Sequence, residues 1–143
     1  MGMFDSFHIS ATALTSQRLR MDTVSANIAN AQTTRGKLVD GEWQPYTRKM
    51  TVLQEAPFRK QLSNAVSGGV QVARIVEDEA PYKLSYDPSH PDADERGYVQ
   101  LPNVDLLKEM VDLMGATRSY EANVAAMNAT KAMLVKAMEI GKG

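Results

Sequence analysis

The sequence contains no cysteine. Disulfide bonds, thiolate nucleophiles and cysteine-ligated metals are therefore excluded, although this absence does not indicate an oxidising or a reducing compartment. The only histidines are His8 and His90, and neither has a second histidine three or four residues away. The spacing argues against a zinc site.

Long apolar runs and a basic excess are also missing. No stretch approaches the roughly 18 apolar residues of a membrane-spanning helix, and the N-terminus lacks the basic-then-apolar layout of a secretory signal. The net charge is -1, which argues against a generally basic nucleic-acid-binding protein. We therefore expect a chain that does not span a membrane, does not bind nucleic acid, and would need another route to leave the cytoplasm.

Recognisable catalytic motifs are absent as well. The sequence has no glycine-rich phosphate loop, and no nucleophile stands beside a base. Asp87, Asp92 and Asp94 lie in a proline-rich segment without the calcium-loop spacing. An enzyme would be indicated if a cleft joined any one of these three carboxylates to an apolar wall. We predict no catalytic residue, metal, cofactor or small-molecule substrate.

The sequence does contain a long amphipathic pattern at its C-terminal end. Apolar residues recur in alternating steps of four and three over residues 103–140, which predicts one helix of roughly 55 Å with a coiled-coil seam. Asn103 is its expected N-cap, and Gly115 is expected to mark a close approach of another helix. A second apolar stripe implies more than one neighbour. The seam comprises Leu106, Met110, Leu113, Tyr120, Val124, Met127, Leu134 and Met138, and the stripe comprises Leu107, Val111 and Met114.

A second periodic segment lies at the N-terminal end. It is expected to begin at Asp5 or Ser6 as the cap and to run to about Ala31. Its apolar residues repeat every seven positions, so this helix can lie along the C-terminal one. Its seam residues are Phe7, Leu14, Met21 and Ile28.

Residues 32–102 have a different pattern. Alternating and β-branched residues predict strands at 48–53, 70–76 and 82–86, and the proline-rich acidic segment 87–97 is predicted to be a loop. The predicted fold is mainly α with a small β insertion, in which long terminal helices form a coiled-coil-like hairpin. The predicted divisions are an N-terminal helix at 1–31, a β-rich insertion at 32–102 and a C-terminal helix at 103–143.

Opposite charges gather within this insertion. Residues 35–60 carry six basic and three acidic side chains, and residues 77–96 carry two basic and seven acidic ones. One interpretation is that neighbouring copies dock these patches together, with Arg48 and Lys49 facing Asp92 and Asp94. Two solvated surfaces are the equally weighted alternative.

Several motifs resemble the flagellar rod and hook family of axial proteins. The family-wide motifs are Asn27-Ile28-Ala29-Asn30 near the first helix end and Tyr120-Glu121-Ala122-Asn123 in the second helix. Segments 45–49, 86–94 and 97–110 resemble the proximal-rod C type within this family. Gln32 and the long 36–42 connection depart from the family pattern and leave the local turn in doubt.

The resemblance implies a structural subunit of the bacterial flagellar basal-body rod, assembled helically and transmitting torque from motor to hook. The implied partners are copies of the chain, other rod proteins and the junction of export gate and membrane ring. The implied location is the rod crossing the periplasm, reached through flagellar type III export without a cleaved signal peptide. The alternative to a rod subunit, if the apolar seams are considered alone, is a soluble helical adaptor. It would use the same seams to form a closed dimer with one signalling partner.

The long, uncovered seams generate a first prediction. Each buried seam residue contributes roughly 1.5–3 kcal/mol, but ordering every residue costs roughly 1–2 kcal/mol, so two helices alone are marginally stable. We expect both terminal helices to be partly disordered in the isolated chain and to order on assembly. Circular dichroism of dilute protein checks this, and a sharp cooperative melt of fully formed helices would contradict it.

Overall fold

The computed structural model describes residues 3–55 and 68–141. The chain divides into two compact units, each containing parts of both terminal helices. The first unit comprises the described residues of 1–21, 51–74 and 114–143, and the second comprises 22–50 and 75–113. The predicted division of the chain into three parts, with boundaries after residues 31 and 102, stays a prediction.

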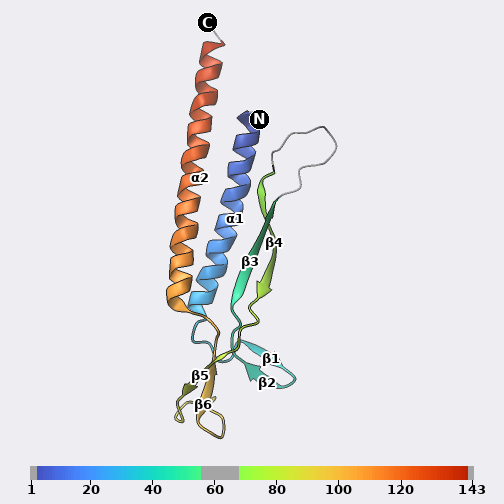
Figure 1. Cartoon of the computed structure of the whole chain (residues 1–143), viewed down its shortest axis with the longest axis vertical. Helices are drawn as coiled ribbons and strands as arrows, with labels where there is room; N and C mark the ends of the chain where they lie inside the picture. Colours follow the sequence, from blue (N-terminus) through green and yellow to red (C-terminus); the bar gives the residue numbers. More distant parts are fainter. Residues whose placement is uncertain (1–2, 56–67, 142–143) are drawn as a thin grey trace. The chain divides into compact units, whose positions relative to one another are not determined.

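The predicted fold class is confirmed, because the chain has two long terminal helices, and short antiparallel strands come between them in the sequence (Figure 1). Helix α1 spans Met3–Ala29 and helix α2 spans Leu106–Ile140. None of the described helices combines the length and hydrophobicity needed to cross a lipid bilayer.

The helix boundaries correct two predicted caps. Asp5 lies inside the first turn of α1, so it does not precede the helix as a cap. At the start of α2 the cap is Asp105, whose Oδ1 accepts hydrogen bonds from the backbone N–H groups of Leu107 at 3.1 Å and Lys108 at 3.4 Å. Asn103 is not the cap, because its side chain is used elsewhere in the second unit.

The strands form two-stranded sheets in the described part of the chain. The predicted strands correspond to β3 (Lys49–Glu55), β4 (Val70–Glu77) and β5 (Lys83–Tyr86). β3 pairs with β4, and β5 pairs antiparallel with β6 (Tyr98–Leu101), a strand that the sequence analysis did not predict. The acidic segment 87–97 is a loop, as predicted.

The other unpredicted feature is an antiparallel hairpin of β1 (Lys37–Val39) and β2 (Glu42–Gln44). Asp40 and Gly41 form its two-residue turn, and both have positive φ, at 52° and 89°. An Asp-Gly pair with two positive φ values is typical of a tight hairpin turn whose twist matches the strands. This turn lies in the connection where the sequence departs from the family pattern.

In the first unit, small polar residues of α1 hold β4. Thr12 Oγ1 accepts a hydrogen bond from the Val70 N–H at 3.3 Å, and Ser16 Oγ lies 3.1 Å from the Val70 carbonyl oxygen. The Thr117 hydroxyl of α2 donates to Met21 Sδ of α1 at 3.5 Å. The side chains that join these elements are therefore largely small and polar.

Burial along α2 follows a heptad pattern. Five residues of the predicted seam are half-buried within the chain, namely Leu113, Tyr120, Val124, Met127 and Leu134. The inward positions between them are buried or half-buried small and polar residues, whereas Met110 is 52% exposed and Met138 is 60% exposed. These intervening positions are Glu109, Ala116, Asn123 and Thr130.

Gly115 is not a point of close helix approach. It is exposed, and a Cβ built there would meet nothing within 4 Å. The tightly packed residue is its neighbour Ala116, which is completely buried. Gly36 is different, because a Cβ there would lie 2.6 Å from the Tyr46 backbone nitrogen and 2.7 Å from Tyr46 Cα.

These two glycines generate opposite predictions. Gly115→Ala should raise the free energy of unfolding by about 1 kcal/mol, because alanine lowers the entropic cost of helix formation without a clash. Gly36→Ala should lower it by about 1–3 kcal/mol, because backbone atoms at the base of the β1–β2 hairpin must move. Denaturant titration of both variants measures whether the free energy of unfolding rises or falls. A loss of stability in Gly115→Ala would contradict the finding that the space around Gly115 is open.

Candidate functional site

Several motif residues converge in the second unit, where they form a buried polar cluster. Its members are Asn27, Tyr46, Arg48, Asp78, Asn103 and Glu109, and we call it the Arg48 cluster. Glu109 and Asn27 are both fully buried, and Arg48 is 8% exposed. A buried charge is costly unless it is paired, so the internal contacts of this cluster decide whether the unit is stable.

Arg48 is the cation of the cluster and binds carboxylates from two directions. Its Nε donates to Glu109 Oε1 at 2.6 Å, and a terminal guanidinium nitrogen donates to Asp78 Oδ2 at 3.1 Å. A third carboxylate, that of Asp112, lies 3.8 Å from the other terminal nitrogen. The guanidinium therefore connects the start of α2 to the segment that follows β4.

Asn27 joins the end of α1 to the same cluster. Its side-chain amide lies within 2.8 Å of the Lys49 carbonyl oxygen and 2.9 Å of Glu109 Oε2, and donates to both. Its carbonyl oxygen accepts from the Tyr46 hydroxyl at 3.0 Å and the Lys49 N–H at 2.9 Å. The four contacts use both ends of the amide, so a hydrophobic side chain of similar size cannot replace it.

Asn103 completes the enclosure of the cluster. Its carbonyl oxygen accepts from the Arg48 N–H at 2.8 Å, and its amide nitrogen donates to the carbonyl oxygens of Asp78 at 3.1 Å and Ala80 at 2.9 Å. Backbone groups next to the strands are thereby satisfied by one side chain. This role is incompatible with the predicted capping of α2.

The contacts of the cluster keep Arg48 and Asp78 ionised and the Tyr46 phenol neutral. Burial acts to lower the pKa of Arg48, but hydrogen bonds and charges from Glu109 and Asp78 outweigh it and raise that pKa above the ordinary value. A hydrogen bond from the Ala80 backbone, followed by the contact with Arg48, lowers the pKa of Asp78. Burial first, and then the charge of Glu109, raises the pKa of the Tyr46 phenol.

The cluster overturns part of the charge-docking interpretation. Arg48 is buried in an internal ion pair and cannot face another copy without unfolding its surroundings. Asp92 is paired as well, because it accepts hydrogen bonds from Arg35 Nε at 2.8 Å and the Thr34 hydroxyl at 2.8 Å in the same chain. Of the basic residues in the predicted patch, Arg59 and Lys60 lie outside the described residues.

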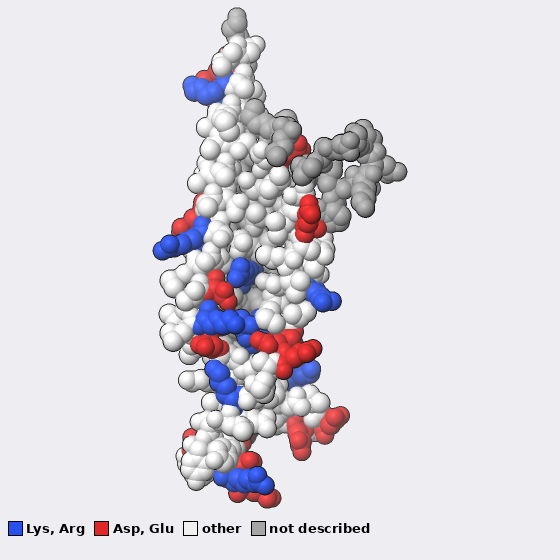
Figure 2. Space-filling view, in the orientation of Figure 1, with Lys and Arg blue, Asp and Glu red and all other residues white. Residues whose placement is uncertain are grey.

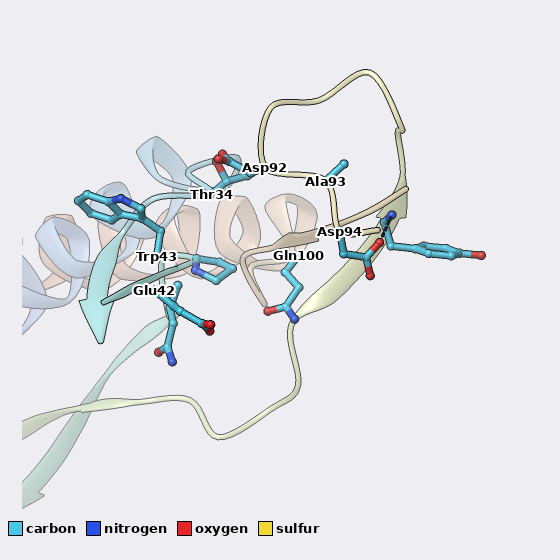
Figure 3. A pocket seen from close by; sticks show the side chains of 10 residues that line it. Thr34, Glu42, Trp43, Asp92, Ala93, Asp94 and Gln100 are labelled. Carbon is cyan, nitrogen blue, oxygen red and sulfur yellow. Dashed lines mark hydrogen bonds between the residues drawn. The ribbon is translucent and has the colours of Figure 1, made fainter. Parts of the chain in front are cut away.

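A hollow of about 560 Å³ in the second unit gathers Asp92 and Asp94 beside Trp43 and Pro45 (Figure 3). Asp92 does not resemble a general acid, because hydrogen bonds from Arg35 and Thr34 hold its pKa below the ordinary value. Asp94 Oδ1 accepts two backbone hydrogen bonds, from Arg96 and Tyr98. Within the described residues, no three metal-ligating side chains form a group.

A second candidate surface is the exposed apolar face of α2. The surface over α2 is largely free of charge apart from a few side chains (Figure 2). Large exposed hydrophobic residues lie in two groups along the helix, at 106–114 and at 133–140, and apolar exposure on this scale is typical of a surface that binds another protein. These residues are Leu106, Leu107, Met110, Val111, Met114, Met133, Val135, Met138 and Ile140.

The predicted family-motif residues have different surroundings. Asn30 helps to end α1, since its amide donates to the Ala26 carbonyl oxygen at 2.9 Å. In α2, Asn123 donates to the Ser119 carbonyl oxygen at 2.8 Å. Ile28 and Tyr120 are half-buried, and Ala29, Glu121 and Ala122 are exposed. Which neighbours cover the exposed motif and seam residues stays a prediction.

The sequence analysis missed the polar role of Glu109 and Asn27. In the sequence, Glu109 stands out only as part of the segment 97–110, and Asn27 only as part of the motif near the end of the first helix. A signal was present, because Arg48, Asn103 and Glu109 all lie in the segments that resemble the C type. Spacing alone does not show that the two segments containing them, 45–49 and 97–110, meet.

The comparisons with known proteins agree with this arrangement of terminal helices and motif residues. A family model described as flagella basal body rod protein matches residues 7–36, and one described as flagellar basal body rod FlgEFG protein C-terminal matches residues 95–140. These matches define the class as flagellar basal-body rod proteins.

Full-length relatives give the particular family. Flagellar basal-body rod protein FlgC of Bacillus subtilis is 58% identical over 150 residues, covering 99% of this chain and 100% of its own. The FlgC protein of Borreliella burgdorferi is 44% identical over 156 residues and 100% of both chains. That of Escherichia coli O157:H7 is 43% identical over 144 residues, covering 99% of this chain and 100% of its own. The chain belongs to the FlgC family of flagellar basal-body rod proteins.

The Arg48 cluster generates a prediction about stability. Arg48→Met should lower the free energy of unfolding by about 3–5 kcal/mol, because it leaves the fully buried Glu109 carboxylate without its cation. The double variant Arg48→Met/Glu109→Met should recover much of this loss, because it removes both buried charges. Denaturant titration of the two single variants and the double variant measures this coupling.

The matched control is the exposed ion pair of Arg35 with Asp92. Arg35→Met should change the free energy of unfolding far less than Arg48→Met does, because solvent screens an exposed pair. Equal losses for Arg48→Met and Arg35→Met would contradict a special role for the buried cluster.

Proposed function

We propose that this basal-body rod protein is a structural, non-catalytic subunit of the proximal rod. It assembles helically with copies of itself and other rod proteins, and the assembly transmits torque from motor to hook. The observation that supports this proposal most strongly is the full-length match to FlgC proteins, combined with apolar side chains exposed along α2. The match to basal-body rod proteins argues against the alternative, a soluble helical adaptor.

Mechanically, the proposal assigns different tasks to the buried and exposed parts. The Arg48 cluster links the end of α1 to the start of α2 through directional hydrogen bonds. Such bonds resist rotation of the two segments against each other better than an apolar contact does. The exposed apolar side chains of α2 become buried between subunits, and this burial drives assembly. Torque passes between subunits along these contacts.

The route and the remaining partners also belong to this proposal. The chain is exported unfolded through the flagellar type III apparatus and reaches the periplasm without a cleaved signal peptide. Its neighbours include the junction of export gate and membrane ring. The predicted marginal stability of the separate chain supports this route, because unfolding before export then requires little free energy.

The predicted seam residue Met138 offers the sharpest test. It is 60% exposed in the single chain, so Met138→Asp should change the free energy of unfolding by no more than about 0.5 kcal/mol. In the rod, the same aspartate would be buried without a partner at a cost of several kcal/mol, so assembly should fail. Cells lacking the native protein and carrying this variant should be non-motile, with the subunit exported but absent from purified basal bodies.

The matched control is Ala125→Asp. Ala125 is exposed on the same helix, on the side away from the predicted seam, and none of the large exposed apolar residues of α2 lies within four positions of it. It should be incorporated more efficiently than Met138→Asp. Motile cells with Met138→Asp in their rods would show that the seam between subunits does not need to exclude water.

A further inference from the structure

The outer side of α2 carries two opposite charges beside exposed apolar residues. Val111 is 63% exposed and Met114 is 56% exposed, and Arg118 and Glu121 are exposed as well. Steps of three, four and three residues place all four on one side of the helix. That side is opposite the completely buried Ala116, so the rest of the chain does not cover it. We call Val111, Met114, Arg118 and Glu121 the α2 face.

The outer side of α1 has a matching set of residues. Arg18, Asp22, Ser25 and Ala29 are all exposed and follow one another in steps of four, three and four. They share one side of a helix that is continuous from Met3 to Ala29. We call Arg18, Asp22, Ser25 and Ala29 the α1 face. Each of the two faces therefore contains one cation and one anion about one helical turn apart.

The order of these charges favours one direction of packing. On both faces the cation precedes the anion in the chain, at Arg18 and Asp22 in α1 and at Arg118 and Glu121 in α2. If the two faces pack antiparallel, Arg18 lies opposite Glu121 in the same alignment that places Asp22 opposite Arg118. Parallel packing can form only one of these two ion pairs at a time. The charges are thus complementary in the antiparallel arrangement.

The uncharged residues fit the same alignment. Continuing it by one and two turns places Ser25 opposite Met114 and Ala29 opposite Val111. A small side chain then faces each large apolar one, which lets side chains of two packed helices interdigitate. Charge and side-chain size therefore select the same antiparallel register.

We propose that the α1 face of one copy of this chain packs antiparallel against the α2 face of a second copy. Two ion pairs fix the direction and register of the contact, and Val111 and Met114 become buried in it. The inference rests on the proposed function, because it names one contact between copies within the rod. It also gives two exposed motif residues, Ala29 and Glu121, a function in assembly.

The exposure of both faces supports a contact between copies. All eight side chains are exposed in the chain, so the two faces do not cover each other within it. Because the faces differ, a copy that binds through one of them still offers the other to a further copy. A contact of this kind can repeat along a helical assembly.

Charge reversal tests the ion pairs in cells that lack the native protein. Arg18→Glu or Glu121→Arg alone replaces an attraction by a repulsion, and should lower the fraction of cells with complete rods by about fivefold. The double variant Arg18→Glu/Glu121→Arg restores an unlike pair between copies and should recover much of that fraction. A double variant no better than either single variant would overturn the pairing.

The matched control is the double variant Arg18→Glu/Arg118→Glu. It also reverses two exposed charges, but it places like charges together in both predicted pairs, so it should not recover complete rods. Recovery in this control would overturn the proposed alignment. Circular dichroism of the purified variants should match that of the native chain, because the altered side chains are exposed.

Cross-linking measures the contact directly, and the absence of cysteine in the chain means that only the introduced thiols of this protein react. Full-length Ala29→Cys and Val111→Cys variants with different tags are expressed together in cells lacking the native protein. Purified basal bodies are treated with a short bifunctional maleimide, and the products are separated by mass. Because the axes of packed helices are about 8–10 Å apart, products that join the two tags should exceed self-linked products about fivefold. The combined Ala29→Cys/Val111→Cys chain should form dimers, trimers and longer products.

Ala122→Cys is the matched control for the register. Ala122 is exposed on the same side of α2 as Val111, about three turns or 16 Å along the helix. The proposal is overturned if Ala122→Cys joins Ala29→Cys as efficiently as Val111→Cys does. It is also overturned if Val111→Cys links mainly to itself, which would show a two-fold contact, or to a different rod protein, which would show another occupant.

The same preparation separates failure of this contact from failure of the proposed function. A tagged chain of native sequence is expressed in parallel. If that chain is absent from the basal bodies, the proposed function fails. If it is incorporated, and the cysteine variants are incorporated without a product joining 29 to 111, only this contact between copies is wrong.

Discussion

The buried ion pair between Arg48 and Glu109 is the interaction on which the second unit depends. Neither charge is tolerated in that environment alone, so the start of β3 and the start of α2 must come together for either to be stable. Asn27 adds the end of α1, because its amide binds the same carboxylate and the Lys49 backbone. Three distant segments are thereby held by directional contacts, while the buried apolar side chains among the described residues are small, for example Val24 and Val99.

The hydrophobic side chains are distributed in a manner that suits an assembly subunit. Small and polar residues such as Ala116 and Thr130 occupy the buried positions of α2, and many of its large apolar residues remain exposed. A protein that functions alone would bury its leucines and methionines first, because these contribute the most free energy. Here that contribution is available for contacts between subunits. The same distribution agrees with membership in a family of rod proteins.

Several parts of the fold were predictable from particular residues. The period of Leu113, Tyr120, Met127 and Leu134 predicts α2 and its half-buried side, and the β-branched residues of 70–76 predict β4. The Asp40-Gly41 turn was missed although its dipeptide is a strong hairpin signal, because the flanking strands have only three residues each. The roles of Asn103 and Gly115 were misassigned, because local propensity describes a helix end or a helix interior and not the neighbours across it.

The sequence by itself determined the fold class, the two terminal helices and the resemblance to flagellar axial proteins. These properties depend on periodicity and on local motifs, which are written along the chain. Only the tertiary structure decided that Arg48 is an internal partner of Glu109, and that Trp43 is opposed to Leu38 on an exposed hairpin. The physical reason is that the free energy of a charge depends on its burial and on partners distant in sequence, 61 residues away in the case of Glu109.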